Sequence, residues 1–263
     1  MAVIYGIHGI EQALAVHREG SPRAARRPLE QLLVARGRGG REVQQLVEAA
    51  RAARVPVRFV QRSELDRLTG TRAHQGVAAM AGAKRYLDLE ELLGAAKSPA
   101  LFVLLDGVED PRNLGAILRT AVCAGADGVI LPQRRATGVT PAAEKVAAGA
   151  AEHISVARVV NLGRALDQLK EAGCWLVGLD ADGERAFTEV DLTVSVGLVL
   201  GGEGKGLHQQ VRKRCDFVAK IPTVGPVGSL NVSVAAGVAL YEVLRQRRVP
   251  PRGDKLRTSS KLS

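Results

Sequence analysis

The chain has 263 residues, of which only 3% are aromatic, and a formal net charge of +10. No apolar run approaches the roughly 18 residues of a membrane-spanning helix, and the N-terminus lacks the basic-then-apolar pattern of a signal peptide, so we expect a cytoplasmic protein without a membrane partner. Cys123, Cys174 and Cys215 form no CxxC pair, which argues against a disulfide framework or a metal site and favours small core residues in a reducing compartment.

The positive charge is concentrated at the two ends of the chain. Residues 1–84 carry 14 Lys and Arg against 7 Asp and Glu, and residues 245–263 carry 7 against 1, whereas the body between them is mildly acidic. This distribution indicates a polyanionic partner, most simply a nucleic acid. A generally arginine-rich composition would explain the same charge without any partner.

Residues 1–84 are predicted to form a small α/β domain. The apolar spacing of residues 42–53 predicts a helix, and residues 57–60 and 77–80 are typical of short strands. Six arginines gather around the first half of this domain and form either a nucleic-acid-binding face or an ordinary solvated surface: Arg23, Arg26, Arg27, Arg36, Arg38 and Arg41. Residues 85–98 are predicted to be a linker with about one helical turn, and the basic tail 249–263 to be disordered.

From residue 99 to residue 248 the pattern predicts a second, larger α/β domain. Short apolar runs at 101–105, 128–131, 174–179, 196–200 and 217–221 are typical of buried strands. Helical patterns at 114–125, 141–151, 162–172 and 204–214 lie between most of them. This alternation predicts a mostly parallel sheet covered on both faces, in which ligands bind at the carboxyl ends of the strands.

Three polar, glycine-containing stretches follow these strands, and the first spans residues 106–120. Asn113 is predicted to cap the helix that begins there. Arg119 lies outside the buried stripe of that helix. It is either an ordinary exposed arginine or a guanidinium that can grip a phosphate.

The second stretch, Gly201–Gly206, has four glycines in six residues but matches neither common phosphate-binding loop. A Walker loop requires Ser or Thr after its lysine, whereas Lys205 is followed by Gly206, and a dinucleotide fingerprint belongs at the first strand-to-helix turn. Glu203 would repel a phosphate. It favours a positive or hydrogen-bonding partner.

The third stretch spans residues 221–236. It contains two prolines and two glycines in a loop, and Ser229 and Asn231 then precede a helix and are predicted to cap it. Alone it could be a simple strand–turn–helix connection. Together the three stretches offer one arginine, one carboxylate, amides and a serine, but no activated cysteine, Ser–His pair, metal cluster or paired carboxylates. Transfer of a group from a bound cofactor fits this set better than hydrolysis.

The segments 110–121, 201–206 and 221–235 resemble, in order, spacing and chemistry, the three signature motifs of the SpoU (TrmH-type) branch of SPOUT RNA 2′-O-ribose methyltransferases. The resemblance spans about residues 100–248. Residues 5–8, 74–77 and 144–152 resemble the subgroup that methylates a guanosine in 23S ribosomal RNA. The resemblance implies a homodimer, a deep C-terminal trefoil knot in the second domain, and an RNA-binding domain similar to ribosomal protein L30e in residues 1–84.

The resemblance also implies a cofactor and roles for particular residues. S-adenosylmethionine would bind through backbone groups at Leu179, Gly201, Ile221 and Leu230. Arg119 would contact the phosphate beside the reacting 2′-hydroxyl and assist loss of its proton. Because a free arginine is essentially always protonated, we favour a phosphate clamp that stabilises the developing alkoxide, with a role as base left open. Asn113, Ser229 and Asn231 would hydrogen-bond the substrate or hold Arg119, and Glu203 would orient the loop or Arg119.

Two positions depart from the family pattern. Alanine is frequent where Gly202 stands, so we expect a slightly looser loop that keeps its backbone contacts. Histidine is frequent at Arg112, so no role is carried over to that side chain.

Other functions remain open from the sequence. Within the class, the target could be a tRNA ribose or the rRNA site whose modification gives thiopeptide resistance. A non-catalytic RNA-binding or ribosome-assembly protein would bind no S-adenosylmethionine, although all three motifs are intact here. A nicotinamide-dependent dehydrogenase is disfavoured because the glycines come late in the domain and lack the fingerprint.

Overall fold

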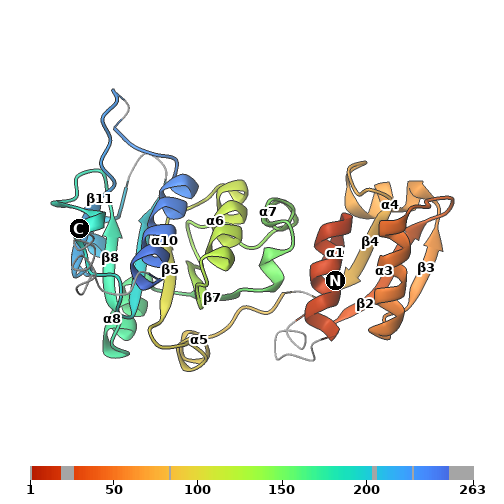
Figure 1. The fold of residues 1–263 in the computed structure, drawn as a ribbon, viewed down its shortest axis with the longest axis horizontal. Helices are drawn as coiled ribbons and strands as arrows, with labels where there is room; N and C mark the ends of the chain where they lie inside the picture. The colour runs from red at the N-terminus through yellow and green to blue at the C-terminus, as the bar shows by residue number, and fades with distance from the viewer. Residues whose placement is uncertain (1, 19–26, 83, 203–205, 227, 249–263) are drawn as a thin grey trace, which may run out of the picture.

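A computed structural model describes residues 2–18, 27–82, 84–202, 206–226 and 228–248. Within them the chain forms a four-stranded sheet near the N-terminus and a seven-stranded sheet in the remainder, which lie side by side (Figure 1). The predicted division into a small and a large α/β unit therefore corresponds to two separate sheets.

The N-terminal sheet has the order β1-β4-β2-β3, in which only β2 and β3 are parallel. Its strands are β1 (Ala2–Tyr5), β2 (Leu29–Ala35), β3 (Val57–Val60) and β4 (Val77–Ala81). Its helices are α1 (Ile7–Arg18), α3 (Arg41–Ala52) and α4 (Arg62–Thr69). Alternation along β2 buries Leu32 and Val34 in one hydrophobic cluster with α1 and α3, and Leu33 in another with α4.

The larger sheet has the order β7-β6-β5-β10-β8-β11-β9, and all of its strand pairs are parallel. The strands are β5 (Leu101–Asp106), β6 (Gly128–Pro132), β7 (Ser155–Val159), β8 (Trp175–Leu179), β9 (Arg185–Ala186), β10 (Val196–Gly201) and β11 (Phe217–Lys220). The predicted parallel sheet is confirmed.

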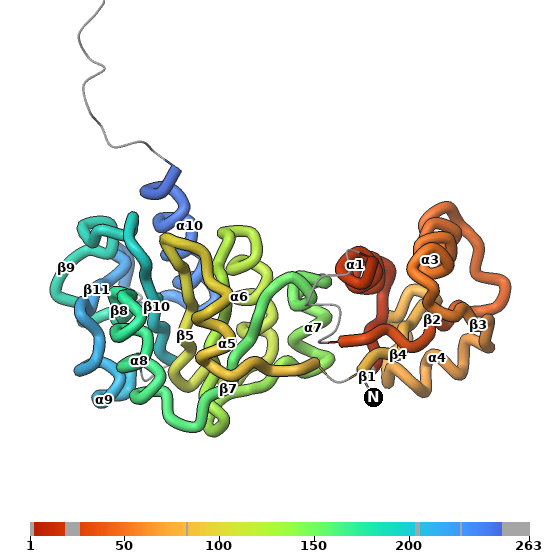
Figure 2. The backbone as a smooth tube through the Cα atoms, turned by 90° about the horizontal axis from the view of Figure 1, so that it is seen from below, coloured from red at the N-terminus to blue at the C-terminus, as the bar shows by residue number. Residues whose placement is uncertain are grey.

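Helices cover both faces of this sheet (Figures 1 and 2). One face carries α6 (Pro111–Cys123), α7 (Pro141–Ala147), η1 (Ala150–Glu152) and α10 (Val232–Arg248), with η2 (Phe187–Glu189) beside them. The other carries α5 (Leu89–Gly94), α8 (Leu162–Glu171) and α9 (Gln209–Arg212). All six residues of β5 are buried, with Val103 facing the first layer of helices and Leu104 the second.

Some local predictions for residues 85–248 differ from the structure. The helix predicted over 204–214 is limited to α9, and β7 was not predicted at all. Residues 85–98, expected to be a linker, contain α5 and bury Leu87, Leu89 and Leu92 against the large sheet, so most of this segment is packed. The tail 249–263 lies outside the described residues.

The strand order brings four carboxyl ends together. Strands β5, β10, β8 and β11 are consecutive neighbours and end at Asp106, Gly201, Leu179 and Lys220. A site at this edge can therefore use all three stretches singled out in the sequence. The trefoil knot stays a prediction.

Candidate active site

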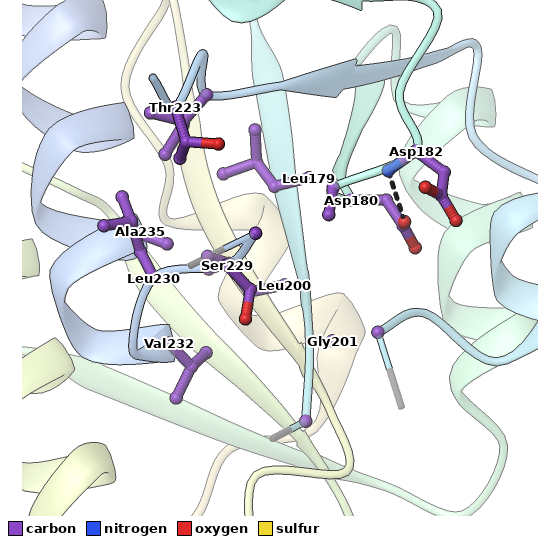
Figure 3. A pocket seen from close by; sticks show the side chains of 15 residues that line it. Leu179, Asp180, Asp182, Leu200, Gly201, Thr223, Ser229, Leu230, Val232 and Ala235 are labelled. Carbon is purple, nitrogen blue, oxygen red and sulfur yellow. Dashed lines mark hydrogen bonds between the residues drawn. The ribbon is translucent and has the colours of Figure 1, made fainter. Parts of the chain in front are cut away.

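A cavity of about 340 Å³ lies at the carboxyl ends of β8, β10 and β11 (Figure 3). All four residues predicted to hold the cofactor line it: Leu179, Gly201, Ile221 and Leu230. Ser229, predicted as a substrate contact, lines the same cavity. Residues from the end of β8 and from the second and third stretches thus surround one cavity, and what they bind stays a prediction.

Two carboxylates in this cavity were not predicted. Asp180 and Asp182 follow β8 directly and line the wall near Leu179 (Figure 3). The Asp180 carboxylate accepts hydrogen bonds from the backbone N–H of Asp182, at 3.1 Å, and from that of Leu207, at 3.2 Å. It therefore anchors the chain just after the glycine loop. An acidic residue directly after a buried strand was the available signal.

A second cavity, of about 540 Å³, adjoins the first and shares Gly202 and Gly206 with it. Its wall includes Asp106, Asn113 and His208. The buried Asp106 carboxylate accepts from the His208 backbone N–H at 2.8 Å and lies 2.9 Å from Nδ1 of the same residue. Asp106 thus joins the end of β5 to the segment after the glycine loop, and sequence reasoning missed this role also.

Asn113 and Asn231 are brought together from helices 118 positions apart. The Asn231 amide Nδ2 donates to Asn113 Oδ1 at 3.1 Å. The prediction that Asn113 caps its helix is wrong. Asp110 is the cap, accepting from the Arg112 backbone N–H at 2.8 Å with Pro111 in the first turn, and Asn113 is a buried residue inside α6. Asn231 does cap α10, since its Oδ1 accepts from the Ser233 N–H at 2.9 Å.

Gly202 is held closely at the end of β10, whereas residues 203–205 of the loop, on which the expected loosening depends, lie outside the described residues. Its N–H donates to the Asp106 carbonyl at 2.7 Å. A Cβ atom at this position would lie 2.2 Å from the Gly107 carbonyl oxygen. An alanine would therefore require the two strand ends to separate.

Arg119 is the predicted residue that the structure does not bring into the site. It lies on the exposed side of α6 and lines neither cavity. Within the described residues its side chain has no hydrogen bond or ion pair. Glu203 lies outside the described residues, so its predicted role is not addressed.

The charge balance of the second cavity is set partly by Asp110. Hydrogen bonds from the Arg112 side chain and backbone lower the pKa of this exposed carboxyl, so it is ionised at neutral pH. In the ranges described above, no group of three or more His, Cys, Asp or Glu side chains is placed to hold a metal ion. Among those same residues, no helix is long and apolar enough to cross a membrane.

Comparisons with known proteins agree with this geometry. Residues 100–241 match the SpoU rRNA Methylase family, and residues 3–87 match the family described as RNA 2′-O ribose methyltransferase substrate binding. The chain is 45% identical over 250 residues to the 23S rRNA (guanosine-2′-O-)-methyltransferase RlmB of Coxiella burnetii, covering 94% of this chain and 96% of that protein. It is 42% identical to RlmB of Pseudomonas putida, covering 94% and 97%.

Solved structures give the same result. The SpoU methyltransferase AviRb of Streptomyces viridochromogenes, in complex with the cofactor S-adenosylmethionine, superposes with a TM-score of 0.78 at 26% identity, covering 93% of this chain and 90% of that one. The two sheets, the paired cavities and the three motifs around them thus have one explanation: the chain belongs to the SpoU rRNA methylase family.

Proposed function

We propose that this protein is an S-adenosylmethionine-dependent methyltransferase that modifies the 2′-hydroxyl of a guanosine ribose in 23S ribosomal RNA. The observation that carries the proposal is the pair of adjoining cavities, one lined by the four predicted cofactor residues and the other by Asn113. The guanosine and the 23S RNA come from the names of the RlmB relatives. Such a substrate would place the activity in the cytoplasm.

The first cavity has the chemistry needed for S-adenosylmethionine. Leu179, Leu200 and Ile221 provide an apolar wall for an adenine ring, and Asp180 and Asp182 provide carboxylates for ribose hydroxyls or an ammonium group. When bound, the cofactor supplies an electrophilic methyl group. The protein has then to position the ribose and help its hydroxyl lose a proton.

The second cavity is the proposed place for the acceptor nucleotide. Gly202 and Gly206 line both cavities, so the two proposed binding places are adjacent. The Asn113–Asn231 pair would hydrogen-bond the ribose, and Ser229 would contact it from the side of the first cavity. Glu203 would orient the glycine loop or an arginine.

We also propose a homodimer, because α10 has an exposed apolar stripe. Val234, Val238 and Tyr241 are 51%, 45% and 53% exposed and recur at helical spacing on one side of this helix. Helix α6 packs against α10 and carries Arg119 on its own exposed side. A second copy on this surface would let the Arg119 guanidinium reach a site from across the interface and bind the phosphate beside the reacting ribose.

The N-terminal domain, residues 1–84, is the proposed RNA anchor. Arg36, Arg38 and Arg41 are exposed around the end of β2 and the start of α3. Arginine contacts to phosphates provide affinity without sequence preference. Residues 99–248 would form the methyltransferase domain, with the trefoil knot that the family resemblance implies.

Replacing Arg119 by alanine tests the assignment. We expect S-adenosylmethionine binding, measured by calorimetry, to be retained, and methyl transfer to RNA to fall by about 100-fold or more, because a donor to the developing negative charge is lost. Arg164→Ala, an exposed arginine on α8, is the matched control. Near-normal turnover of Arg119→Ala would reject the role of this residue.

The RNA target needs a separate experiment. Mass-spectrometric mapping of 2′-O-methylguanosine in 23S RNA, with and without the gene, should show one modification that depends on the protein. An unchanged 23S map with a lost tRNA methylation would instead support the tRNA alternative.

A further inference from the structure

The two domains are joined by a buried ion cluster. Arg27, which precedes β2 in the N-terminal domain, reaches Glu144 on α7 and Glu152 on η1. Its Nη1 lies 2.6 Å from Glu144 Oε1 and 2.7 Å from Glu152 Oε1, and its Nη2 lies 3.2 Å from Glu144 Oε2. The side chains are only 3%, 13% and 11% exposed. Arg27 was grouped in the sequence with surface arginines, and the structure shows that it is not one.

Further contacts surround this cluster. Helix α1 packs on η1 and β1 packs on α7. Figure 2 shows α7 at the side of the large domain that faces α1 and β1. His153 Nε2 lies 2.6 Å from Gln12 Oε1, and Lys84 Nζ donates to the Ala151 carbonyl. A Cβ at Gly149 would lie 2.6 Å from Gln12 Cγ, so the two domains approach closely here.

The segments that carry the subgroup resemblance meet at this boundary. A cavity of about 430 Å³ between the domains is lined by residues from 5–8, 74–77 and 144–152. Within the N-terminal domain, Gln75 Oε1 accepts from the Ile7 N–H at 3.0 Å and so ties two of these segments together. None of these three segments takes part in the proposed chemistry. What they share is their position where the two domains pack together.

The electrostatics of the cluster favour a role in fixing how the two domains are arranged rather than in adding stability. Burial raises the pKa of Glu144, even though the charge of Arg27 opposes this shift. The two carboxylates in turn raise the pKa of Arg27 against the effect of its own burial. Because the cost of removing these charges from water offsets much of their attraction, the cluster is weak evidence for added stability. A buried ion cluster is, however, compensated only when every partner is in place, so it disfavours other domain arrangements.

The cluster is also close in the fold to the proposed active site. Glu144 adjoins Ala143, whose carbonyl oxygen would lie 2.3 Å from a Cβ at Gly115. Gly115 is two residues from Asn113 on α6. A continuous series of contacts therefore runs from Arg27 through α7 and α6 to the second cavity.

We propose that Arg27 is a positioning residue for the methyl-transfer reaction: by binding Glu144 and Glu152 it fixes the RNA-anchoring domain relative to the site where the ribose reacts. This inference rests on the proposed function. An RNA held by the N-terminal domain places its target nucleotide correctly only if the distance between the domains is set. Arg27 itself is buried and lines neither of the two cavities.

Four variants of the full chain test the proposal. Arg27→Ala leaves two carboxylates without their cation and can fail to fold. The triple variant Arg27→Met, Glu144→Gln, Glu152→Gln removes all three charges at similar volume and is the decisive one. Arg27→Lys keeps the positive charge but cannot bind the Glu144 carboxylate through two parallel N–H groups. Its distance distribution and its kcat/KM should therefore lie between those of the unaltered protein and those of the triple variant. Arg51→Ala, an exposed arginine on α3, is the matched control.

The first measurement is the distance between the domains, by pulsed electron paramagnetic resonance. Nitroxide labels are placed at Gln45→Cys on α3 and Glu171→Cys on α8, both exposed positions, with Cys123→Ser. Cys174 is buried and burial raises the pKa of Cys215 to about 12, so neither competes for the label. Labelled protein is diluted with unlabelled protein to isolate distances within one chain. We expect one narrow distribution for the unaltered interface and for Arg51→Ala, and a broad one for the triple variant.

The second measurement is activity. For the triple variant, kcat/KM with 23S ribosomal RNA should fall about 10- to 100-fold, the cost of a misplaced reacting group, while the calorimetric Kd for S-adenosylmethionine is unchanged. An unchanged distance distribution, or a broad one with unchanged kcat/KM, overturns the proposal. Failure of the unaltered protein to methylate RNA would instead contradict the proposed function, and the distances, which require no RNA, would still decide whether the cluster fixes the domains.

Discussion

At the scale of single residues, Asn231 has two tasks that use different atoms. Its Oδ1 accepts from the Ser233 N–H and caps α10, whereas its Nδ2 donates to Asn113 in the second cavity. Helix stability and the proposed acceptor site therefore depend on one side chain.

Two substitutions separate these tasks. Asn231→Ala removes both and should lower the free energy of unfolding by about 1 kcal/mol and also reduce methyl transfer. Asn231→Asp keeps a good cap but has no amide N–H for Asn113, so stability should be close to that of the unaltered protein and activity should still fall. Guanidinium denaturation and a methyl-transfer assay measure the two effects. Full activity in the aspartate variant would mean that the cap is the only role.

Residue roles were predicted from sequence only where the cause is local. Asn231 was correctly assigned as a cap, because capping depends on neighbouring backbone. The assignment of Asn113 as a cap was wrong, because Asp110 followed by Pro111 is the stronger signal for a helix start. The burial of Arg27 could not be predicted, since its partners are 117 and 125 positions away.

At the scale of elements, the contact between α6 and α7 depends on Gly115. A Cβ there would lie 2.3 Å from the Ala143 carbonyl oxygen and 2.8 Å from Val146 Cβ. Backbone atoms cannot move aside as a flexible side chain can. The helix that carries Asn113 and Arg119 can therefore approach α7 this closely only because residue 115 has no side chain.

Gly115→Ala should destabilise the protein by about 1–3 kcal/mol, because extra volume in a closely packed contact forces backbone shifts. Gly237→Ala on α10 is the control: the nearest atom, Thr120 Cγ2, would be 3.8 Å away, which is ordinary contact. That variant should be neutral or more stable by up to about 1 kcal/mol, from helix propensity. Equal stabilities of the two variants by denaturant titration would contradict the close contact.

Elements were predicted well where burial on both faces makes a strand wholly apolar, as in β5 and β10. Strand β7 was not predicted, because it lies at the sheet edge and includes Ser155 and Arg158, which interrupt the apolar run. The helix predicted after the glycine loop was too long, since 3.6-residue spacing alone does not specify where a helix begins.

At the scale of the whole molecule, the apolar stripe on α10 predicts the oligomeric state. We expect the protein to sediment as a dimer, and Val238→Glu to sediment as a monomer with reduced RNA methylation, because a carboxylate would be buried in an apolar interface. Val160→Glu, at a position 81% exposed beyond β7, should remain dimeric. A monomeric unaltered protein in analytical ultracentrifugation would contradict the interface.

The presence of two α/β sheets followed from sequence patterns, and the motifs located four residues that line the first cavity. The arrangement of the two units did not, because it depends on contacts such as Gln12 with His153, which neither periodicity nor composition encodes.

The position of Arg27 in the chain has a consequence for biosynthesis. Glu152 is made 125 residues later, which at ribosomal speeds of about 5–20 residues per second is a delay of roughly 6–25 s. The N-terminal sheet is complete at Ala81 and has its own hydrophobic clusters, so it can form during this interval. Until then the Arg27 guanidinium is hydrated, at no cost to that sheet. We therefore expect the N-terminal sheet to provide a preformed surface on which the larger sheet and its helices dock after they are synthesised.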